Sequence, residues 1–479
     1  MFHGNGSISL KILQYLPGLP PVMGGGMIKY ALDLAQGEIE AGHEVILLVP
    51  GCFTHCHKDK TWIIKKKWHE IEYYSIINPL PVTRGKGVSV LTTLIEKGDI
   101  HVYVKFLQEL RPEIIHIHSL MGMHLAFLEA ASHIGIPTIY TTHDYYGICP
   151  KAILLNGAGQ CVVFDGSQCA DCFDKIIKIN KAKRCQSEAY RWLKSNRMIH
   201  CLEYSQKLIP LKIYVRSLLQ GDSRKHGTSK KDIKIVQQEE NYRKLQQYYR
   251  EMFAYMTKFH YNSRQSKKIF EQYLGNITGE VIPISNSNIS DKRKIRNFGK
   301  TLHMGFIGRE AYKGFELLKA ALADLYTGGL QDFKCHVYFN PKEKLPSYII
   351  SHAPFNEENM EQVYDGIGIL LLPSVWKETY GLVVPEAISR GIPVIVSCNV
   401  GSRQLLTEHQ GIGIVIEPTK EDLKEALEMI YRNRELLKQM NQKICDCELN
   451  LGYEQHVEQI VHMYQKYREA LIKGENDGC

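Results

Sequence analysis

No run of 18 or more apolar residues occurs in the 479-residue sequence, which argues against a membrane-spanning helix. The first residues, MFHGNGSISLKILQYL, lack the basic region, apolar core and small-residue cleavage site of a secretion signal. We therefore expect a cytoplasmic protein whose 13 cysteines are reduced thiols or metal ligands, not disulfides. Low-complexity tracts and internal repeats are also missing, and 23% charged residues is typical of a globular chain.

The length exceeds what one hydrophobic core usually supports, so two domains are expected. Strand and helix patterns alternate from residue 10 to residue 144, and the alternation starts again at residue 302. This rhythm predicts an α/β fold with two Rossmann-like parallel sheets, whose ligands bind beyond the carboxyl ends of the strands in a deep cleft between facing domains. We expect an N-terminal domain over 1–284, a C-terminal domain over 300–452, and a final helix, 453–479, that packs back on the first domain.

The net charge of +8 is unevenly distributed. Residues 174–250 contain 19 Lys and Arg against 7 Asp and Glu. The excess of positive charge in this segment is larger than the net charge of the whole chain. This segment interrupts the strand and helix alternation, so it reads as an insertion. An anionic membrane surface or a phosphorylated acceptor would attract it, and a solvated helical insertion is the simpler alternative. Nucleic acid is a less favoured partner.

Glycines 24–26 follow the first predicted strand and open the first predicted helix. Consecutive glycines at a helix start let backbone N–H groups approach an anion. The dinucleotide fingerprint GxGxxG is missing, and the second strand ends in VPG, where an NAD site would place an acid. A phosphate-binding loop and a plain flexible loop both remain open.

Histidines occur at two predicted strand ends in the same half of the chain. His116 and His118 alternate on EIIHIHS, so they share one face of that strand and are expected to be packed or hydrogen-bonded. His143 and Asp144 follow IPTIYTT, at the mouth of the predicted sheet. There a neutral imidazole can hydrogen-bond a substrate hydroxyl or carbonyl.

Charged residues mark two strand ends in the second half. Arg309 and Lys313 stand in FIGREAYKG, where two fixed cations suit a diphosphate, although cations in exposed loops often have no ligand. Glu378 follows the apolar strand IGILLLPS, and Pro385 suits the first position of the next helix. Glu386 then lies in the first turn, where a carboxylate also stabilises the helix dipole. Two acids so placed can grip two sets of vicinal hydroxyls.

Four of these motifs together resemble the group 1 (family 4) glycosyltransferases, retaining enzymes with the GT-B fold that use nucleotide-sugar donors. The motifs are GGGM in the first loop, TTHD at a strand end, GREAYKG, and ETYGLVVPE for the E-x7-E pattern. Their order and spacing match over most of the chain, except 174–250. One departure is that ISNSNIS stands where many members have an N-G-[IV]-D turn.

The resemblance implies the roles of the site residues. Glu378 would hold hydroxyls of the donor sugar and Glu386 the ribose, while Arg309 and Lys313 would neutralise the diphosphate. His143 would contact the donor sugar near the reaction centre. Backbone amides near the sugar or phosphates would come from Gly381, Leu382 and Val383, and, from the opposite domain, from Gly25 and Gly26. The departing phosphate would deprotonate the acceptor on the same face, so the chemistry needs no cofactor or metal.

A cysteine group follows His143 and contains only one C-x2-C pair, which is a partial zinc signature. Its members are Cys149, Cys161, Cys169 and Cys172. The spacing is similar to a cysteine pattern in some members of the same family. A structural zinc knuckle that shapes the acceptor side is the favoured interpretation, and free thiols or a redox role are the alternatives. A second group, CFTHCH, is spaced too tightly to interpret.

The sequence thus predicts transfer of a sugar from a UDP- or GDP-sugar to a glycan or lipid-linked acceptor, with retention, in cell-surface polysaccharide or glycoconjugate biosynthesis. The basic insertion would hold the enzyme on the inner face of the membrane. Two alternatives remain: a sugar-nucleotide epimerase of the same fold, and a catalytically silent nucleotide- or glycan-binding protein.

Overall fold

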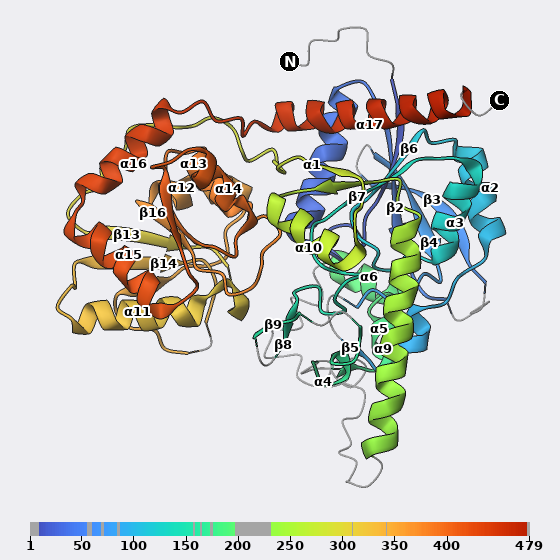
Figure 1. Ribbon diagram of the computed structural model, residues 1–479, viewed down its shortest axis with the longest axis horizontal. Helices are drawn as coiled ribbons and strands as arrows, with labels where there is room; N and C mark the ends of the chain where they lie inside the picture. The colour runs from blue at the N-terminus through green and yellow to red at the C-terminus, as the bar shows by residue number, and fades with distance from the viewer. Residues whose placement is uncertain are drawn as a thin grey trace. The chain divides into compact units, whose positions relative to one another are not determined.

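The computed structural model describes residues 9–54, 60–68, 71–83, 87–156, 159–162, 165–172, 176–196, 231–308, 310–341 and 343–476 (Figure 1). Arg309, residues 55–57 of the CFTHCH group and residues 197–230 of the basic insertion lie outside this part. The chain divides into two compact units. Unit 1 comprises Met1–His260, Phe270–Glu280 and Ile460–Cys479, and unit 2 comprises Tyr261–Ile269 and Val281–Gln459. No helix in the described ranges has the length and apolarity needed to cross a membrane.

Unit 1 is built on an eight-stranded sheet with the order β12-β11-β7-β6-β1-β2-β4-β3. Its central pairings are parallel, as the alternation predicted, and the edge strand β3 runs antiparallel to its neighbour β4. The strands are β1 Lys11–Tyr15, β2 Glu44–Pro50, β3 Trp62–Trp68, β4 Ile71–Ile77, β6 Ile114–Ile117, β7 Thr138–Thr141, β11 Lys258–Tyr261 and β12 Gly279–Val281. The inner strands are almost wholly buried, because helices cover both faces of a parallel sheet.

The helices of unit 1 begin and end where the sequence provides caps. In α2 (Ile100–Leu110) the Asp99 side chain accepts a hydrogen bond from the His101 N–H, and α3 (Leu125–Ile134) ends at Gly135 with left-handed backbone. The remaining helices and short strands are α1 Gly26–Glu40, β5 Gly87–Val88, η1 Leu91–Leu94, β8 Leu155–Asn156, β9 Gly159–Gln160, α4 Cys169–Cys172, β10 Ile176–Ile177, α5 Ile179–Arg184, α6 Glu188–Ser195 and α9 Lys231–Ala254.

The described part of the basic insertion is not all solvated. In α9 the side chains of Leu245, Met252 and Phe253 are buried, and the Tyr248 hydroxyl donates to the carbonyl of Glu96 at 3.1 Å. The same hydroxyl accepts from the Leu125 N–H at 2.9 Å. The second half of α9 therefore belongs to the core of unit 1, and the insertion is a structural part of that unit.

Unit 2 has a six-stranded sheet, wholly parallel, with the order β15-β14-β13-β16-β17-β18. Its strands are β13 Leu302–Phe306, β14 Phe333–Val337, β15 Ile349–Ser351, β16 Ile369–Leu372, β17 Val394–Ser397 and β18 Gly413–Ile416. Alternate residues of β16 enter separate cores: Ile369 and Leu371 join one cluster, and Leu370 and Leu372 join the other. Both faces of the sheet are therefore covered, as predicted for a doubly wound fold.

The helices of unit 2 lie on the two faces of its sheet. On one face α11 and α15 pack together, and on the other α12, α13 and α14 contribute to the second core cluster (Figure 1). The helices are α10 Arg264–Leu274, which the unit boundary crosses, η3 Ala311–Lys313, α11 Phe315–Thr327, η4 Glu357–Asn359, α12 Met360–Asp365, α13 Val383–Ile388, η5 Gly401–Arg403, α14 Gln404–Glu408, α15 Lys420–Arg432 and α16 Glu435–Asp446.

The polar stretch 285–300 has no helix or strand, yet it is fixed to unit 2. Arg293 donates to the carbonyls of Ile444 and Cys447, and Arg296 donates to the carbonyls of Tyr364 and Ile367. Each arginine satisfies carbonyls at the end of a helix, which a flexible linker would leave to water. This stretch is therefore an ordered part of unit 2.

The last helix, α17 (Tyr453–Asn476), has the buried face that the sequence predicted, with Val457, Ile460, Val461 and Tyr464 all buried. Its residues from Ile460 onward belong to unit 1. There Arg468 forms an ion pair with Glu113 at 2.5 Å. The helix thus supplies unit 1 with side chains from the far end of the sequence.

Candidate active site

Glu378 lies beyond β16 in a segment that pairs with the loop after β17. Its N–H donates to the carbonyl of Asn399 at 2.9 Å, and its own carbonyl accepts from the N–H of Gly401 at 3.0 Å. These bonds form a short parallel bridge between Glu378 and Val400. The backbone of Glu378 is therefore held on both sides, and its side chain is only 8% exposed.

The Glu378 carboxylate forms an ion pair with the Lys313 ammonium through Oε1. Its other oxygen, Oε2, is buried and has no hydrogen-bond partner among the described residues. A buried carboxylate oxygen without a donor is costly, so it marks a place where a ligand can donate. Lys313, which the sequence assigned to the diphosphate, thus lies against the sugar-binding candidate, while Arg309 is outside the described residues.

The loop that carries Lys313 is tied to the segment that carries Glu378. The N–H of Val375 donates to the Tyr312 carbonyl at 2.9 Å, and the Lys313 ammonium lies 5.8 Å from the centre of the Trp376 ring. Gly314 has φ +91°, and a Cβ there would lie 2.0 Å from the Pro373 carbonyl oxygen. Only glycine permits this approach, which explains the glycine of the GREAYKG motif.

Glu386 is likewise buried, with 6% of the residue exposed, but both of its oxygens have partners. The Asn286 amide donates to Oε1 at 3.2 Å, and the Tyr364 hydroxyl donates to Oε2 at 2.8 Å. The Arg390 guanidinium donates to the Glu386 carbonyl at 2.9 Å. Asn286 belongs to the ISNSNIS turn that departs from the family pattern, and it nevertheless contacts this glutamate. A carboxylate accepts more than one bond per oxygen, so Glu386 keeps capacity for a ribose diol.

The prediction that Pro385 is the first helical residue was wrong. Helix α13 begins at Val383, two residues earlier, and Leu382 is its N-cap residue. The start moves because Gly381, with φ +93°, turns the chain before Leu382. Glu386 still lies in the first turn, as predicted.

We expect Gly381→Ala to destabilise unit 2 by about 1 to 3 kcal/mol. The positive φ strains any L side chain, and the new Cβ would lie 3.0 Å from Val400 Cγ1. Gly329→Ala is the matched control, since Gly329 has φ +89° but no atom within 4 Å of the added Cβ. Thermal unfolding measures both variants. A smaller loss for Gly381→Ala than for Gly329→Ala would contradict the close packing.

In unit 1 the glycine loop precedes α1. Gly25 has φ +118°, and a Cβ at Gly24 or Gly25 would meet no atom within 4 Å. The loop is exposed, and Gly26 is the first residue of the helix. The structure therefore leaves room for an anion at this helix start.

His143 is half-buried after β7, and its ring contacts two aromatic neighbours. The His118 Nδ1 and His143 Nε2 atoms are 3.1 Å apart, and the Tyr30 ring centroid is 4.8 Å from that of His143. Burial and the neighbouring histidines lower the pKa of His118 well below its ordinary value, so that ring is neutral. The Nε2 atom of His118 lies 3.3 Å from the side-chain amide oxygen of Gln14. Nε2 must carry the proton, and Nδ1 then accepts from His143.

A second chain of polar side chains extends from His116, whose ring centroid lies 4.2 Å from that of His118. His116 Nδ1 is 2.5 Å from the Tyr464 hydroxyl, and its Nε2 is 2.6 Å from the Thr141 hydroxyl. The Thr141 hydroxyl is 2.8 Å from His260 Nδ1. The prediction that His116 and His118 share a face and are hydrogen-bonded is therefore confirmed.

Glu38 of α1 joins the two chains. Its Oε1 is 2.9 Å from the Tyr464 hydroxyl, and its Oε2 accepts from the Gln14 amide at 2.6 Å. Burial raises the pKa of Glu38 from 4.5 to about 8, against the hydrogen bonds from Tyr464 and Gln14, which lower it. Burial also raises the pKa of Asp144, beside His143 in sequence, to about 6. The network thus runs unbroken from His143 to the C-terminal helix.

Four residues that contact the candidate site residues or their hydrogen-bond network were not predicted from the sequence: Glu38, Gln14, Asn286 and Tyr364. One signal was available for Glu38. It falls on the apolar stripe of α1 with Ile28, Ala31 and Leu34, and an acid on such a stripe needs a partner. Asn286 and Tyr364 had no comparable signal, because their partner is distant in sequence.

Cys169 is surrounded by the other three cysteines of its group. Burial, and then the proximity of Cys149, Cys161 and Cys172, raise the pKa of the Cys169 thiol to about 12. Within the described ranges, however, no group of three or more His, Cys, Asp or Glu residues is arranged to hold a metal ion.

Binding of a structural zinc by the four cysteines therefore stays a prediction. It implies one zinc ion per chain. Elemental analysis of freshly purified protein tests it, with Cys169→Ser losing the metal and Cys335→Ser, a buried cysteine of unit 2, keeping it. Zinc-free wild-type protein would reject the knuckle and leave the four residues as thiols.

Two sequence families match successive parts of the chain. Residues 288–444 match "Glycosyl transferases group 1", and residues 24–158 match "Glycosyltransferase Family 4". No curated protein matches the sequence.

Three solved structures illustrate the similarity of fold. Sucrose-phosphate synthase from Thermosynechococcus elongatus has 13% identity and a TM-score of 0.55, over 96% of this chain and 99% of that one. Anabaena Alr3699/HepE in complex with UDP and glucose has 13% identity and a TM-score of 0.54, over 95% and 100%. WaaG, a glycosyltransferase involved in lipopolysaccharide biosynthesis, has 13% identity and a TM-score of 0.52, over 95% and 99%. Taken with the two family matches, these findings identify the chain as a glycosyltransferase of the group 1 / family 4 class, with the GT-B fold.

Proposed function

We propose that the protein transfers a sugar from a UDP- or GDP-sugar to a glycan or lipid-linked acceptor with retention of anomeric configuration. The observation that carries the proposal is the buried Glu378 carboxylate, with one oxygen on Lys313 and the other without a donor among the described residues. A sugar hydroxyl supplies the missing donor, and the Lys313 charge lies beside it for the diphosphate. Glu386, held by Asn286 and Tyr364, then takes the ribose.

In this proposal the reaction depends on charge stabilisation and positioning. Negative charge grows on the departing diphosphate, where Lys313 and Arg309 neutralise it, assisted by the amides of Gly381, Leu382 and Val383 and by the loop of Gly25 and Gly26. The departing phosphate takes the proton of the acceptor hydroxyl on the same face of the sugar, so the new bond keeps the configuration of the old one. His143, oriented by His118, contacts the donor sugar near the reaction centre.

We further propose that the acceptor belongs to cell-surface glycan biosynthesis, and that the enzyme works in the cytoplasm, peripherally at the inner face of the membrane. The excess of Lys and Arg over residues 174–250 supports attraction to an anionic surface. WaaG, which shares the fold, acts in lipopolysaccharide biosynthesis, and HepE was solved with UDP and glucose. Deleting 223–234 should weaken binding to vesicles that contain anionic lipid, and unchanged binding would reject the membrane role.

Incubation of the full chain with a panel of nucleotide sugars, with and without glycan acceptors, tests the function. We expect slow release of free nucleotide without acceptor, faster release with the correct acceptor, and an α- or β-linkage in the product that matches that of the donor. An altered sugar still attached to nucleotide would identify an epimerase instead. Binding without turnover across the panel would favour a catalytically silent protein, and an inverted linkage would reject the retaining mechanism.

A further inference from the structure

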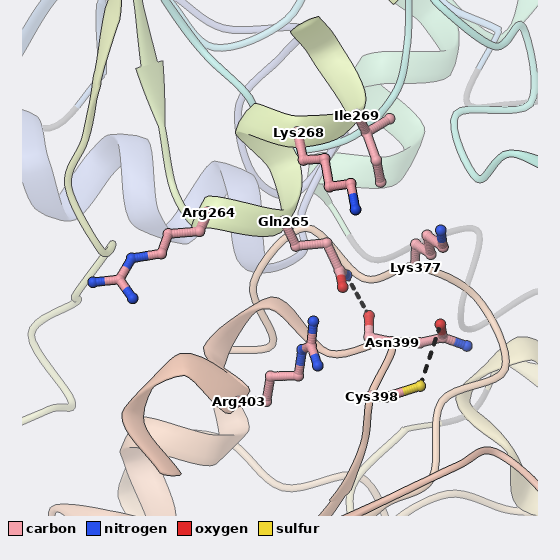
Figure 2. A pocket seen from close by; sticks show the side chains of 8 residues that line it. All are labelled: Arg264, Gln265, Lys268, Ile269, Lys377, Cys398, Asn399 and Arg403. Atoms are coloured by element: carbon pink, nitrogen blue, oxygen red, sulfur yellow. Dashed lines mark hydrogen bonds between the residues drawn. The ribbon is translucent and has the colours of Figure 1, made fainter. Parts of the chain in front are cut away.

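A hollow of about 410 Å³ lies in unit 2 beside the Glu378 segment (Figure 2). The first turns of α10 form one wall, and the opposite wall is made by Lys377, by Cys398 and Asn399 after β17, and by Arg403 of η5. None of these residues belongs to the donor site described above. Lys377 immediately precedes Glu378, so the hollow and the donor site share one stretch of backbone.

Four of the eight side chains that line the hollow are cationic and none is acidic. Arg264 is paired with Glu408 at 2.7 Å, and in Figure 2 it points away from the others. Lys268 reaches in from α10, and Arg403 rises from the opposite wall toward Gln265 (Figure 2). Lys377 is half-buried, as is Arg403. For these three cations the described part of the chain provides no carboxylate within ion-pair distance.

The positive charge reaches the base of the hollow. Burial and a hydrogen bond to Glu417 raise the pKa of the Cys398 thiol to about 11, while Arg403 and Lys377 both act to lower it. Like charges that share a partly buried space repel one another and lose hydration, and an anion between them removes both costs. Guanidinium and ammonium groups that line one space from separate elements are suited to the several oxygens of a phosphate.

The walls of the hollow are fixed by backbone hydrogen bonds. The Gln265 amide donates to the carbonyls of Glu378 and Asn399, at 2.9 and 2.5 Å (Figure 2). The Ser263 hydroxyl donates to the Thr379 carbonyl at 2.5 Å. An anion bound here therefore contacts the same loops that orient Glu378, so its position is defined relative to the donor sugar.

We propose that Lys268, Lys377 and Arg403 bind a phosphate or diphosphate group of the acceptor. This inference rests on the proposed transferase function, because the donor diphosphate is already assigned to Lys313 and Arg309. A second anion site next to the donor site then requires a second phosphorylated substrate. Lipid-linked sugars and phosphorylated sugars both carry such a group, and three cations in one hollow match one phosphate or diphosphate.

Inorganic pyrophosphate, titrated calorimetrically into the full chain saturated with UDP, tests the hollow itself. We expect one pyrophosphate per chain in the presence of UDP. Binding should weaken about tenfold or more in Arg403→Gln and in Lys377→Gln, since each removes a charge-assisted contact. Lys438→Gln, an exposed lysine of α16 paired with Glu435, is the matched control and should bind as the wild type does. Equal binding in all four proteins, or no binding with UDP present, would overturn the proposal.

The source of the phosphate is decided by a second arm with geranyl diphosphate, geraniol and glucose 1-phosphate as competitors of pyrophosphate. Competition by geranyl diphosphate but not geraniol assigns a lipid-linked acceptor, and competition by glucose 1-phosphate alone assigns a phosphorylated sugar. Acceptor-free release of nucleotide by the wild type is measured in parallel. If the wild type releases no nucleotide, the transferase function is rejected, whereas the pyrophosphate titration still tests the hollow. Arg403→Lys keeps the charge and should retain most of the pyrophosphate binding. Complete loss of binding in this variant would reject recognition by charge.

Discussion

Replacing Glu378 with glutamine is expected to lower kcat/KM by about 100-fold or more while leaving the fold intact. Glutamine keeps the shape but places an amide where a carboxylate oxygen accepts. Because the amide keeps only one acceptor oxygen, either the sugar hydroxyl or the Lys313 ammonium loses its acceptor, and the Lys313 charge loses its counter-ion. Glu316→Gln is the matched control, because Glu316 forms an exposed pair with Lys319 at 2.9 Å in the same unit. Wild-type turnover in Glu378→Gln would reject the site assignment.

The double variant Glu378→Gln/Lys313→Met separates catalysis from stability. Each single change leaves one partly buried partner without its pair, which is expected to reduce stability by about 1 to 3 kcal/mol. Removing both charges should restore part of that stability, whereas activity should remain as low as in the worse single variant. Thermal unfolding and kcat/KM of the four proteins provide the comparison. Recovery of activity in the double variant would contradict the proposed roles.

Glu38→Gln is expected to change how stability depends on pH. The unfolded chain loses the Glu38 proton near pH 4.5, whereas the folded chain keeps it until about pH 8. Between these values the folded state binds more protons, so this group lowers the free energy of unfolding by up to about 1.4 kcal/mol for each pH unit gained. The wild type should therefore lose stability relative to Glu38→Gln as pH rises from 5 to 8.

Melting temperatures at pH 5, 6, 7 and 8 provide the measurement. Buried histidines such as His118 and His124 have lowered pKa values and act in the opposite direction, but they are common to both proteins and cancel in the difference. Glu40→Gln, two residues further along α1 and exposed, should follow the wild-type profile. Parallel profiles for wild type and Glu38→Gln would show that Glu38 is ionised in the folded chain.

The sequence was informative wherever a feature repeats along the chain. Alternating apolar segments predicted both parallel sheets, and alternation within EIIHIHS placed His116 and His118 on one face. The edge strand β3 and its neighbour β4 were not predicted, since WIIKKKWHEIEYYSII has lysines on one strand and is only partly buried. The start of α13 was misplaced because the turn at Gly381 outweighs the preference of Pro385 for the first helical position.

The residues of the candidate site were named from the sequence, and their roles stay predictions, but their contacts with one another were not foreseen. Glu378 and Lys313 were assigned to different parts of one ligand, whereas in the structure they form an ion pair. Glu386 was assigned to the ribose, and in the structure it receives bonds from Asn286 and Tyr364. Such pairs join residues 22 to 100 positions apart, and a single sequence contains no signal for which polar groups meet across that distance.

The distance of Tyr464 from Glu38, 426 residues along the chain, has a consequence for biosynthesis. A ribosome adds about 5 to 20 residues per second, so roughly 20 to 90 seconds separate the appearance of the acid from that of its partner. During that interval all of unit 2 is synthesised, and the Glu38 carboxyl and the His116 imidazole lack the hydrogen bonds that Tyr464 later provides. Unit 1 is thus completed last although it is begun first, and a nascent chain that stalls before the final helix would be recognisable to proteases.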